Sequence, residues 1–238
     1  MKVFELMCTA YLKSDIPFKD SFEAIAKYIN YSIHLAGLNE IHESKEYKYY
    51  TFGSFYPIEE DKIYKKGKIY QFTIRTLNKT LAIALYSGLK NNANNKYFTI
   101  VEIGKKEISR FFISELYSLS PVIVSIDNGR FWTIKESGDV EELRKLLHNN
   151  VEKKYKSFFN ENINVQQNFI QFIEIKNRVP QSIMIVKDDK DVRFFGNKLK
   201  IIPNEDEISQ KLAFTAFACG LGEKNSYGGG FVLAKGIK

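Results

Sequence analysis

The sequence has only two cysteines, Cys8 and Cys219, among its 238 residues. Two cysteines in apolar-periodic stretches build neither a disulfide framework nor a thiolate metal site. Long apolar runs are also missing, because Ser125 interrupts even the run that begins at Pro121, so no segment is expected to span a bilayer. The N-terminus carries Glu5 and lacks the small-residue cleavage site of a signal peptide. These absences predict a soluble, cytoplasmic protein.

Glycine and proline are scarce as well, at 14 and 5 residues, whereas apolar residues make up 44% of the chain. This composition supplies enough apolar side chains for a sizeable core and excludes the disordered and fibrous classes. At about 150 residues per domain, the length predicts one large or two small domains.

Acidic residues are outnumbered: 35 Lys and Arg stand against 28 Asp and Glu, which gives a net charge of +7 and an isoelectric point near 9.1. The basic residues are spread over both halves, so the chain has no basic tail. A basic folded surface suits a polyanionic partner such as nucleic acid. A generally lysine-rich composition explains the same balance equally well.

The first half of the chain predicts strands and helices in a regular order. Residues 2–12 alternate apolar and polar side chains, which is typical of a half-buried strand. Asp20 and Ser21 offer a helix N-cap, and apolar residues follow at helical spacing until Gly37. Further strands are expected over residues 49–57, 68–76 and 97–108, and a further helix over 77–90.

The second half repeats this order more loosely. Strands are expected over residues 122–126, 168–178, 182–186, 192–202 and 228–235, and helices over 140–159 and 205–219. We therefore predict an α+β fold of two tandem ferredoxin-like (βαββαβ) domains, residues 1–118 and 119–238, the second less regular. No internal sequence repeat is visible, so the prediction depends on element order alone.

Five of the 14 glycines fall within residues 220–230. This segment is no Walker loop, because Lys224 is not followed by Ser or Thr at the required place. It is no dinucleotide fingerprint either, because Asn225 occupies the position of the third glycine. A glycine-rich loop around Lys224 lets backbone N–H groups approach phosphates. A glycine-capped helix that leads into a glycine-rich strand gives the same pattern, so both interpretations stay open.

The glycine-rich segment resembles the signature of the RAMP superfamily of CRISPR-associated RNA-binding proteins. That signature runs glycine, hydrophobic residue, glycine, five residues, glycine, hydrophobic residue, glycine; here Gly229 replaces the second hydrophobic residue. The matching positions are Gly220, Leu221, Gly222, Gly228 and Gly230. Within the superfamily the whole chain resembles the repeat-cleaving endoribonucleases of the Cas-six type. Residues 42–52 are similar to their catalytic-histidine segment, and residues 119–124 to the start of their second domain.

The resemblance implies a catalytic site at His42, with Lys48 six residues further on and Tyr28 of the first helix as a weaker partner. Tyr28 precedes His42 by 14 residues, which would span about 21 Å of unbroken helix, so this pair requires a turn near Gly37. A catalytic role competes with a simpler interpretation at each residue: Lys48 as a solvated loop charge and Tyr28 as a core residue. Tyr31 is the alternative to Tyr28 as the tyrosine of the site. Two further histidines are expected to have no chemical role: His34 as a structural residue on a helix face, and His148 as a solvated surface residue.

RNA binding is expected to be shared between the glycine-rich loop and basic residues of the second half. On the predicted strand 192–202, alternation places Lys198 and Lys200 on one face and Arg193 on the other. Phe194 and Phe195 are expected to belong to the core. The predicted RNA-binding residues are Gly220, Gly222, Lys224, Gly228, Gly230, Lys176, Arg178, Arg193, Lys198 and Lys200. Ordinary surface charge is an equally good interpretation of each basic residue alone.

The implied activity is cleavage of precursor CRISPR RNA within its repeats by the RNA 2′-hydroxyl, giving 2′,3′-cyclic phosphate and 5′-hydroxyl ends. The tethered hydroxyl lowers the barrier by proximity, a histidine transfers protons, and a lysine stabilises phosphorane charge. The histidines lack close ligand spacing and the carboxylates are scattered, so we expect neither a metal nor another cofactor.

The main alternative is a non-catalytic RNA-binding RAMP subunit of a CRISPR effector complex. His42 and Lys48 together favour the enzyme, because a pure RNA-binding protein needs neither. A small-molecule phosphatase would need an early arginine loop, and the first arginine is Arg75. The expected partners are precursor CRISPR RNA and other CRISPR effector subunits, with no membrane, in a monomer or homodimer.

Overall fold

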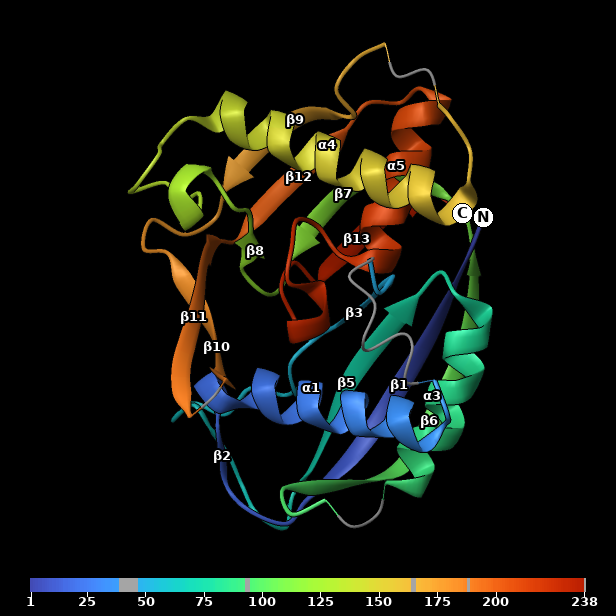
Figure 1. Cartoon of the computed structure of the whole chain (residues 1–238), viewed down its shortest axis with the longest axis vertical. Coiled ribbons are helices and arrows are strands. Elements are labelled where there is room, and N and C mark those ends of the chain that lie inside the picture. Colours follow the sequence, from blue (N-terminus) through green and yellow to red (C-terminus); the bar gives the residue numbers. More distant parts are fainter. Residues whose placement is uncertain (39–46, 93–94, 164–165, 188, 238) are drawn as a thin grey trace.

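The computed structural model describes residues 1–38, 47–92, 95–163, 166–187 and 189–237. The strands of these residues form two four-stranded sheets and one three-stranded sheet, besides the short pair β2 (Ile16–Pro17) and β4 (Ile63–Tyr64). Each four-stranded sheet combines with two helices into one unit, and the two units lie one above the other in Figure 1.

The N-terminal unit has the sheet order β3-β5-β1-β6, and every neighbouring pair is antiparallel. This is the ferredoxin-like arrangement predicted from the element order. Its elements are β1 (Lys2–Leu12), α1 (Phe18–Leu35), β3 (Tyr50–Phe52), β5 (Ile69–Thr76), α3 (Lys79–Asn91) and β6 (Phe98–Ser109).

The two helices of this unit pack against each other over the buried side of the sheet. Asn78 caps α3 by accepting a hydrogen bond from Leu81 N at 3.0 Å. Gly88 permits the close helix approach, since a Cβ there would lie 2.0 Å from the carbonyl oxygen of Ser32. The predicted N-cap of α1 is wrong: the helix begins at Phe18, and Asp20 lies in its first turn, where a carboxylate favours the helix dipole.

The C-terminal unit has the sheet order β13-β7-β12-β9, again fully antiparallel and ferredoxin-like. Both helices begin at an aspartate that caps the first turn: Asp139 accepts from Glu142 N and Asp206 from Ser209 N. The elements are β7 (Phe112–Ser118), α4 (Val140–Phe159), β9 (Ile170–Ile175), β12 (Leu199–Pro203), α5 (Glu207–Cys219) and β13 (Val232–Ile237).

The three-stranded sheet is inserted into the C-terminal unit, in the order β10-β11-β8, from β8 (Val122–Ile123), β10 (Gln181–Lys187) and β11 (Lys190–Asn197). The single strand expected over 192–202 is therefore wrong, because β11 and β12 belong to different sheets. The chain changes direction where Asn197 accepts from Ile134 N and donates to the carbonyl of Asn177. Gly196 lets β11 approach β8, since a Cβ would lie 2.1 Å from the oxygen of Val122.

The first strand of the second sheet is β7, which pairs with β12 and β13. The sequence-based division after Ser118 assigns these residues to the N-terminal domain, and it takes residues 122–126 as the first strand of the next. We propose instead that the division lies between β6 and β7, because the sheet partners change there.

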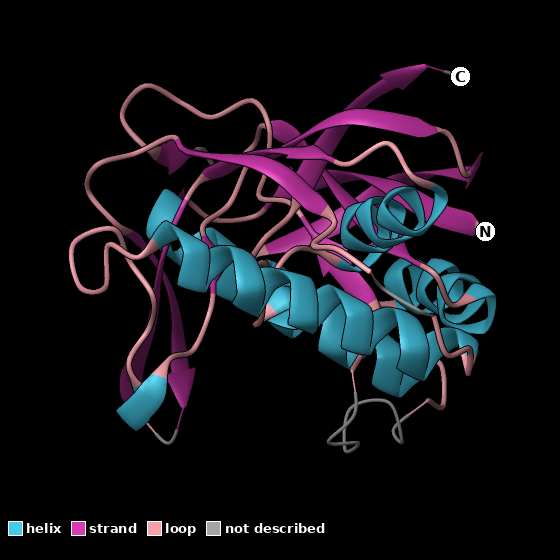
Figure 2. Cartoon of the chain, turned by 90° about the horizontal axis from the view of Figure 1, so that it is seen from above, coloured by secondary structure: helices cyan, strands magenta, loops and turns pink. Residues whose placement is uncertain are grey.

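Seen from above, the helices gather on one side of the two main sheets (Figure 2). Of the helices that the structure describes, none is both long enough and apolar enough to cross a bilayer. The two cysteines are buried free thiols, Cys8 on β1 and Cys219 at the end of α5.

Candidate functional site

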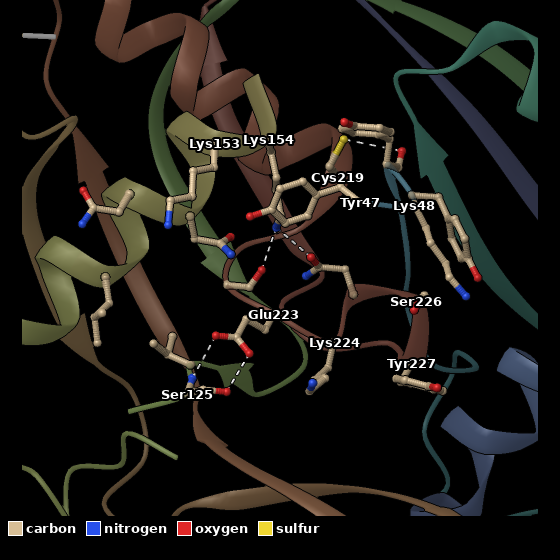
Figure 3. Close-up of a pocket in the computed structure, with 18 residues that line it drawn as sticks. Tyr47, Lys48, Ser125, Lys153, Lys154, Cys219, Glu223, Lys224, Ser226 and Tyr227 are labelled. Carbon is tan, nitrogen blue, oxygen red and sulfur yellow. Dashed lines mark hydrogen bonds between the residues drawn. The ribbon is translucent and has the colours of Figure 1, made fainter. Parts of the chain in front are cut away.

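A cavity of ≈570 Å³ lies where three segments that are distant in sequence meet: residues 47–50 at the start of β3, residues 146–154 of α4, and the glycine-rich loop after α5. Residues 124–125, after β8, complete its wall. Figure 3 shows side chains from all three segments around this space, among them Lys48, Lys153 and Lys224. The structure thus brings the predicted site residues Lys48 and Lys224 to one cavity.

Tyr49 anchors the segment that carries Lys48. The Tyr49 backbone is left-handed, with φ at 49°. Its hydroxyl hydrogen-bonds the hydroxyl of Ser157 at 2.6 Å, and its ring packs edge-on against Phe158, with centroids 5.0 Å apart. Its carbonyl accepts from the hydroxyl of Thr76 at 2.7 Å. These contacts to α4 and β5 fix the place at which residue 48 enters the cavity wall.

Lys48 is half-buried in this wall, and burial lowers the pKa of its ammonium. Burial disfavours the charged form of the lysine, whereas an anion beside the ammonium stabilises the protonated form. Lys48 is therefore suited to hold a phosphate group.

Glu223 is the one carboxylate among the described residues that line the cavity. Its oxygens accept from the backbone N and the hydroxyl of Ser125, at 3.1 and 2.7 Å. Burial, and then the Glu223 charge, raises the pKa of Tyr47 on the opposite wall. The lysines lining the cavity outnumber this carboxylate, so the cavity is cationic.

The glycines of the loop, which the sequence predicts to bind RNA, are buried. A Cβ on Gly222 would lie 2.5 Å from the oxygen of Ile123, and one on Gly228 would lie 2.4 Å from the ring of Phe22. At Gly230 a Cβ would lie 1.8 Å from the oxygen of Leu221. Gly220 caps α5 with φ at 85°. The glycines therefore let the loop pack closely against α1, β8 and itself.

The backbone N–H groups of the loop are largely used within the protein. Those of Gly228, Gly229 and Gly230 donate to the carbonyls of Asn225, Lys224 and Pro121 at 2.9–3.0 Å. The partly exposed part of the loop is residues 223–227, whose side chains line the cavity. Within it, the Lys224 ammonium lies 5.3 Å from the ring centroid of Phe194. The side chains of this short stretch therefore line the cavity together with Gly222.

Tyr28, the expected weaker catalytic partner, lies in the core of the N-terminal unit. Its side chain is fully buried and stacks on Phe98, with ring centroids 4.5 Å apart. Its hydroxyl donates towards the carbonyls of Leu89 and Asn92, at 3.0 and 2.7 Å. Core packing, the alternative interpretation, is correct. Tyr31 is 53% exposed on α1 and does not line the cavity.

The histidines divide into three cases. His42 lies outside the described residues, five positions before Tyr47. His34 is exposed on α1. His148 is not the solvated residue expected: its ring stacks on Phe169, and its Nδ1 accepts from the backbone N of Phe169 at 3.1 Å. Burial lowers the pKa of His148, so the neutral ring that accepts this bond is favoured.

Four of the basic residues predicted to bind RNA do not line the cavity: Lys176, Arg178, Lys198 and Lys200. Lys176 and Arg178 follow the last residue of β9 instead of lying on it. Lys176 pairs with Glu174, and Lys200 on β12 pairs with Glu115, both at 2.8 Å. Burial lowers the pKa of Lys198, in the connection between β11 and β12.

Arg193 lies on β11, in a different sheet from Lys200. It lines a separate cavity of ≈550 Å³ with Arg130 and Phe195. Phe195 is 42% exposed, so its expected place in the core is wrong, whereas Phe194 is buried as expected. Neighbouring strand residues point to opposite faces, and only the Phe194 face packs against the loop, at Tyr227.

Among the residues that the structure describes, no group of three or more His, Cys, Asp or Glu side chains is placed to hold a metal ion.

Sequence reasoning missed Lys153 and Lys154, which line the cavity from α4. A signal for Lys154 was present, because it continues the buried stripe of α4 formed by Leu143, Leu147 and Val151. A lysine at a position that helical spacing assigns to the core is unusual and identifies a residue with special partners.

Comparison with known proteins places the chain in context. The family model described as CRISPR associated protein Cas6, C-terminal, matches residues 103–233. The CRISPR-associated endoribonuclease Cas6 2 of Methanocaldococcus jannaschii is 28% identical over 207 residues, which cover 81% of this chain and 83% of the relative.

Two solved structures share the fold. One, described as CRISPR associated protein Cas6, has a TM-score of 0.72 at 22% identity and covers 98% of this chain and 99% of its own. The other, described as an RAMP protein binding different RNA substrates, has a TM-score of 0.70 at 16% identity, with the same coverage.

Proposed function

The chain belongs to the Cas6 family of CRISPR-associated proteins, whose C-terminal model matches more than half of its residues, and on this basis we propose that it is an endoribonuclease that cuts precursor CRISPR RNA within the repeats. The endoribonuclease among its relatives, similar over four-fifths of this chain, supports the activity.

The observation that carries this proposal is the cationic cavity between the two units. Lys48, Lys153 and Lys224 reach it from three different segments, and the RNA backbone is the anion that such a set would bind. Tyr47 and Tyr227 supply rings in the same cavity, on which an unstacked base could lie. We propose that the scissile phosphate binds at Lys48.

The proposed reaction is a transesterification that RNA can carry out on itself once it is correctly held. The 2′-oxygen loses its proton to a base and forms a bond to the adjacent phosphorus, while the bond from phosphorus to the 5′-oxygen breaks. An acid protonates the leaving 5′-oxygen, so the products are a 2′,3′-cyclic phosphate and a 5′-hydroxyl. No water, oxidant or other reactant is consumed.

We assign the proton transfer to His42, because histidine titrates near neutral pH, and the charge stabilisation to Lys48. The Lys48 ammonium meets a phosphorane that carries more negative charge than the ground-state phosphate. Its attraction therefore grows towards the transition state, which is the condition for faster chemistry. Tyr28 has no part in this proposal, since its hydroxyl is committed inside the core.

Cleavage of a CRISPR repeat RNA in excess EDTA tests the proposal. We expect the protein to cut at one position, to give a cyclic phosphate end, and to leave uncut a substrate with a 2′-deoxy sugar at the scissile nucleotide. Cleavage that EDTA stops would contradict metal-independent chemistry. Tight, salt-sensitive binding without any cleavage would instead identify a non-catalytic RNA-binding RAMP subunit.

A further inference from the structure

Lys154 of α4 is 3% exposed, and its ammonium is surrounded by the glycine-rich loop. It donates hydrogen bonds to the carbonyl oxygens of Gly220 and Gly222, at 2.9 and 2.6 Å, and to Oδ1 of Asn225 at 2.7 Å (Figure 3). An ammonium has three hydrogens, so each has an acceptor in this loop.

All three acceptors of Lys154 are uncharged. Among the described residues, no carboxylate lies within 4.0 Å of its nitrogen. Burying an unpaired ammonium is costly, and burial accordingly lowers the pKa of Lys154 to about 8. An apolar side chain would fill the stripe of α4 without this cost, so core packing alone gives no reason for a lysine here.

Asn225 extends the contacts of Lys154 across the whole loop. While its Oδ1 accepts from Lys154, its Nδ2 donates to the carbonyls of Leu221 and Gly229, at 3.3 and 2.8 Å. Leu221 belongs to the arm that leaves α5, and Gly229 belongs to the arm that enters β13. Lys154 therefore fixes a side chain that bonds both arms, beside the backbone hydrogen bond from Leu221 N to the carbonyl of Gly230.

The loop residues that face the cavity lie between these arms. Lys224 adopts a left-handed conformation, with φ at 57°, and residues 225–227 form a single helical turn after it. Such a short turn has little stability of its own. Its place at the cavity depends on contacts from outside. Lys154 bonds Asn225 of the turn directly and the carbonyls of Gly220 and Gly222 in the arm that precedes it.

We propose that Lys154 is a positioning residue for RNA binding: its ammonium holds the glycine-rich loop in the conformation that presents residues 223–227 to the RNA. This inference rests on the proposed function, because it takes the ligand of the cavity to be RNA. Lys154 itself lies beneath the loop and does not touch the RNA. Its neighbour Lys153 is exposed at the same cavity and contacts the phosphate backbone directly.

The test compares Lys154→Met with Lys153→Met, which remove the same charge from adjacent positions. Amide hydrogen exchange of the free proteins is measured by mass spectrometry on peptides that cover residues 220–231. Affinity for a CRISPR repeat RNA is measured at several salt concentrations.

We expect Lys154→Met to speed amide exchange in this loop by about tenfold, because the three loop acceptors of Lys154 lose their donor. We expect RNA binding to weaken by about the same factor. The slope of log affinity against log salt should stay as in the wild type. Lys153→Met should leave exchange unchanged and reduce the magnitude of that slope by about 0.7, the value for one lost phosphate contact on a single strand.

Wild-type exchange in Lys154→Met would overturn the proposal, and so would a reduced salt slope, which would make Lys154 a direct phosphate contact. If Lys154→Met does not fold, Asn225→Ala is the second variant. It removes one acceptor of Lys154 and the two Nδ2 bonds to Leu221 and Gly229, and the same faster exchange is required of it. The exchange measurement uses no RNA. A wild-type protein that fails to bind repeat RNA would therefore contradict the proposed function, whereas unchanged exchange would contradict only the role of Lys154.

Discussion

The guanidinium of Arg75 lies 4.1 Å from the ring centroid of Phe217, so a buried cation of the N-terminal unit stacks on the last turn of α5. Phe231 covers its other side at 4.5 Å. Arg75 also pairs with Glu5 at 2.7 Å and donates to the carbonyl of Val232 at 2.6 Å. One side chain of β5 thus joins the two units beside the glycine-rich loop.

Replacing Arg75 should destabilise the protein strongly. In Arg75→Met, Glu5 loses its partner in a mostly buried place and the carbonyl of Val232 loses its donor, so we expect the free energy of unfolding to fall by about 3 kcal/mol. Urea unfolding measures this. Arg110→Met is the matched control: its pair with Glu207 is long, at 3.8 Å, and largely exposed, and it should change stability by less than about 1 kcal/mol. Equal effects of the two variants would contradict a bridging role for Arg75.

Comparison of Gly228→Ala with Gly67→Ala distinguishes the cost of a steric clash from the cost of an unfavourable backbone conformation. Both glycines have a positive φ, 89° and 82°, but a Cβ would meet the Phe22 ring at 2.4 Å only at Gly228 and would find open space at Gly67. We expect Gly67→Ala to cost about 1 kcal/mol of stability and Gly228→Ala about 2 kcal/mol more. Gly228→Ala should also weaken RNA binding, because the loop must move away from α1. Thermal unfolding and RNA titration check both results, and equal costs would show that the loop has room at Gly228.

The topology could be predicted from sequence because each ferredoxin-like unit follows from local patterns. Alternation in residues 2–12 and helical spacing after Phe22 depend on single elements, and their order then allows few arrangements. The inserted sheet was missed for a physical reason. Residues 192–202 form one continuous apolar and polar pattern, and the break at Asn197 is caused by side-chain bonds to Ile134 and Asn177, which only the folded chain brings near.

The sequence singled out Lys48 and Lys224 because each is a lysine within a segment that resembles a family motif. Both lysines line the cavity. The glycines identified the loop that borders the cavity, but their close packing against Phe22, Ile123 and Leu221 depends on the folded chain and could not be predicted from their spacing. Tyr28 shows the limit of spacing, because nothing in the sequence reveals that its hydroxyl meets the carbonyls at the end of α3.

Stability should depend on pH through Lys154. Its pKa of about 8 in the folded protein lies below the value of 10.5 for an exposed lysine, so the unfolded chain binds the proton more tightly. Stability therefore rises with pH between about 8 and 10.5, where the folded protein has lost a proton that the unfolded chain keeps.

We expect the free energy of unfolding of the wild type, relative to Lys154→Met, to increase by on the order of 1–2 kcal/mol from pH 7 to pH 9.5. Urea unfolding of both proteins at the two pH values measures this difference. A constant difference would mean that Lys154 keeps an ordinary pKa despite its burial.

Lys48→Met should slow cleavage of a saturating repeat RNA by about 100-fold and change RNA affinity much less, because the Lys48 charge acts mainly in the transition state. Single-turnover rates and equilibrium binding separate the two effects. Lys200→Met, which removes a lysine paired with Glu115 outside the cavity, should leave the rate unchanged. An equal loss in binding and none in rate would make Lys48 a simple phosphate contact.

The most direct test of the account is the single-turnover cleavage rate of a CRISPR repeat RNA by His42→Ala beside His34→Ala. His34 is exposed on α1 and does not line the cavity, so it provides a histidine of the same chain outside the proposed chemistry. We predict that His42→Ala loses a factor of about 100 to 10,000 in rate while it still binds the RNA, and that His34→Ala cuts like the wild type. Wild-type cleavage by His42→Ala would contradict the proposed mechanism.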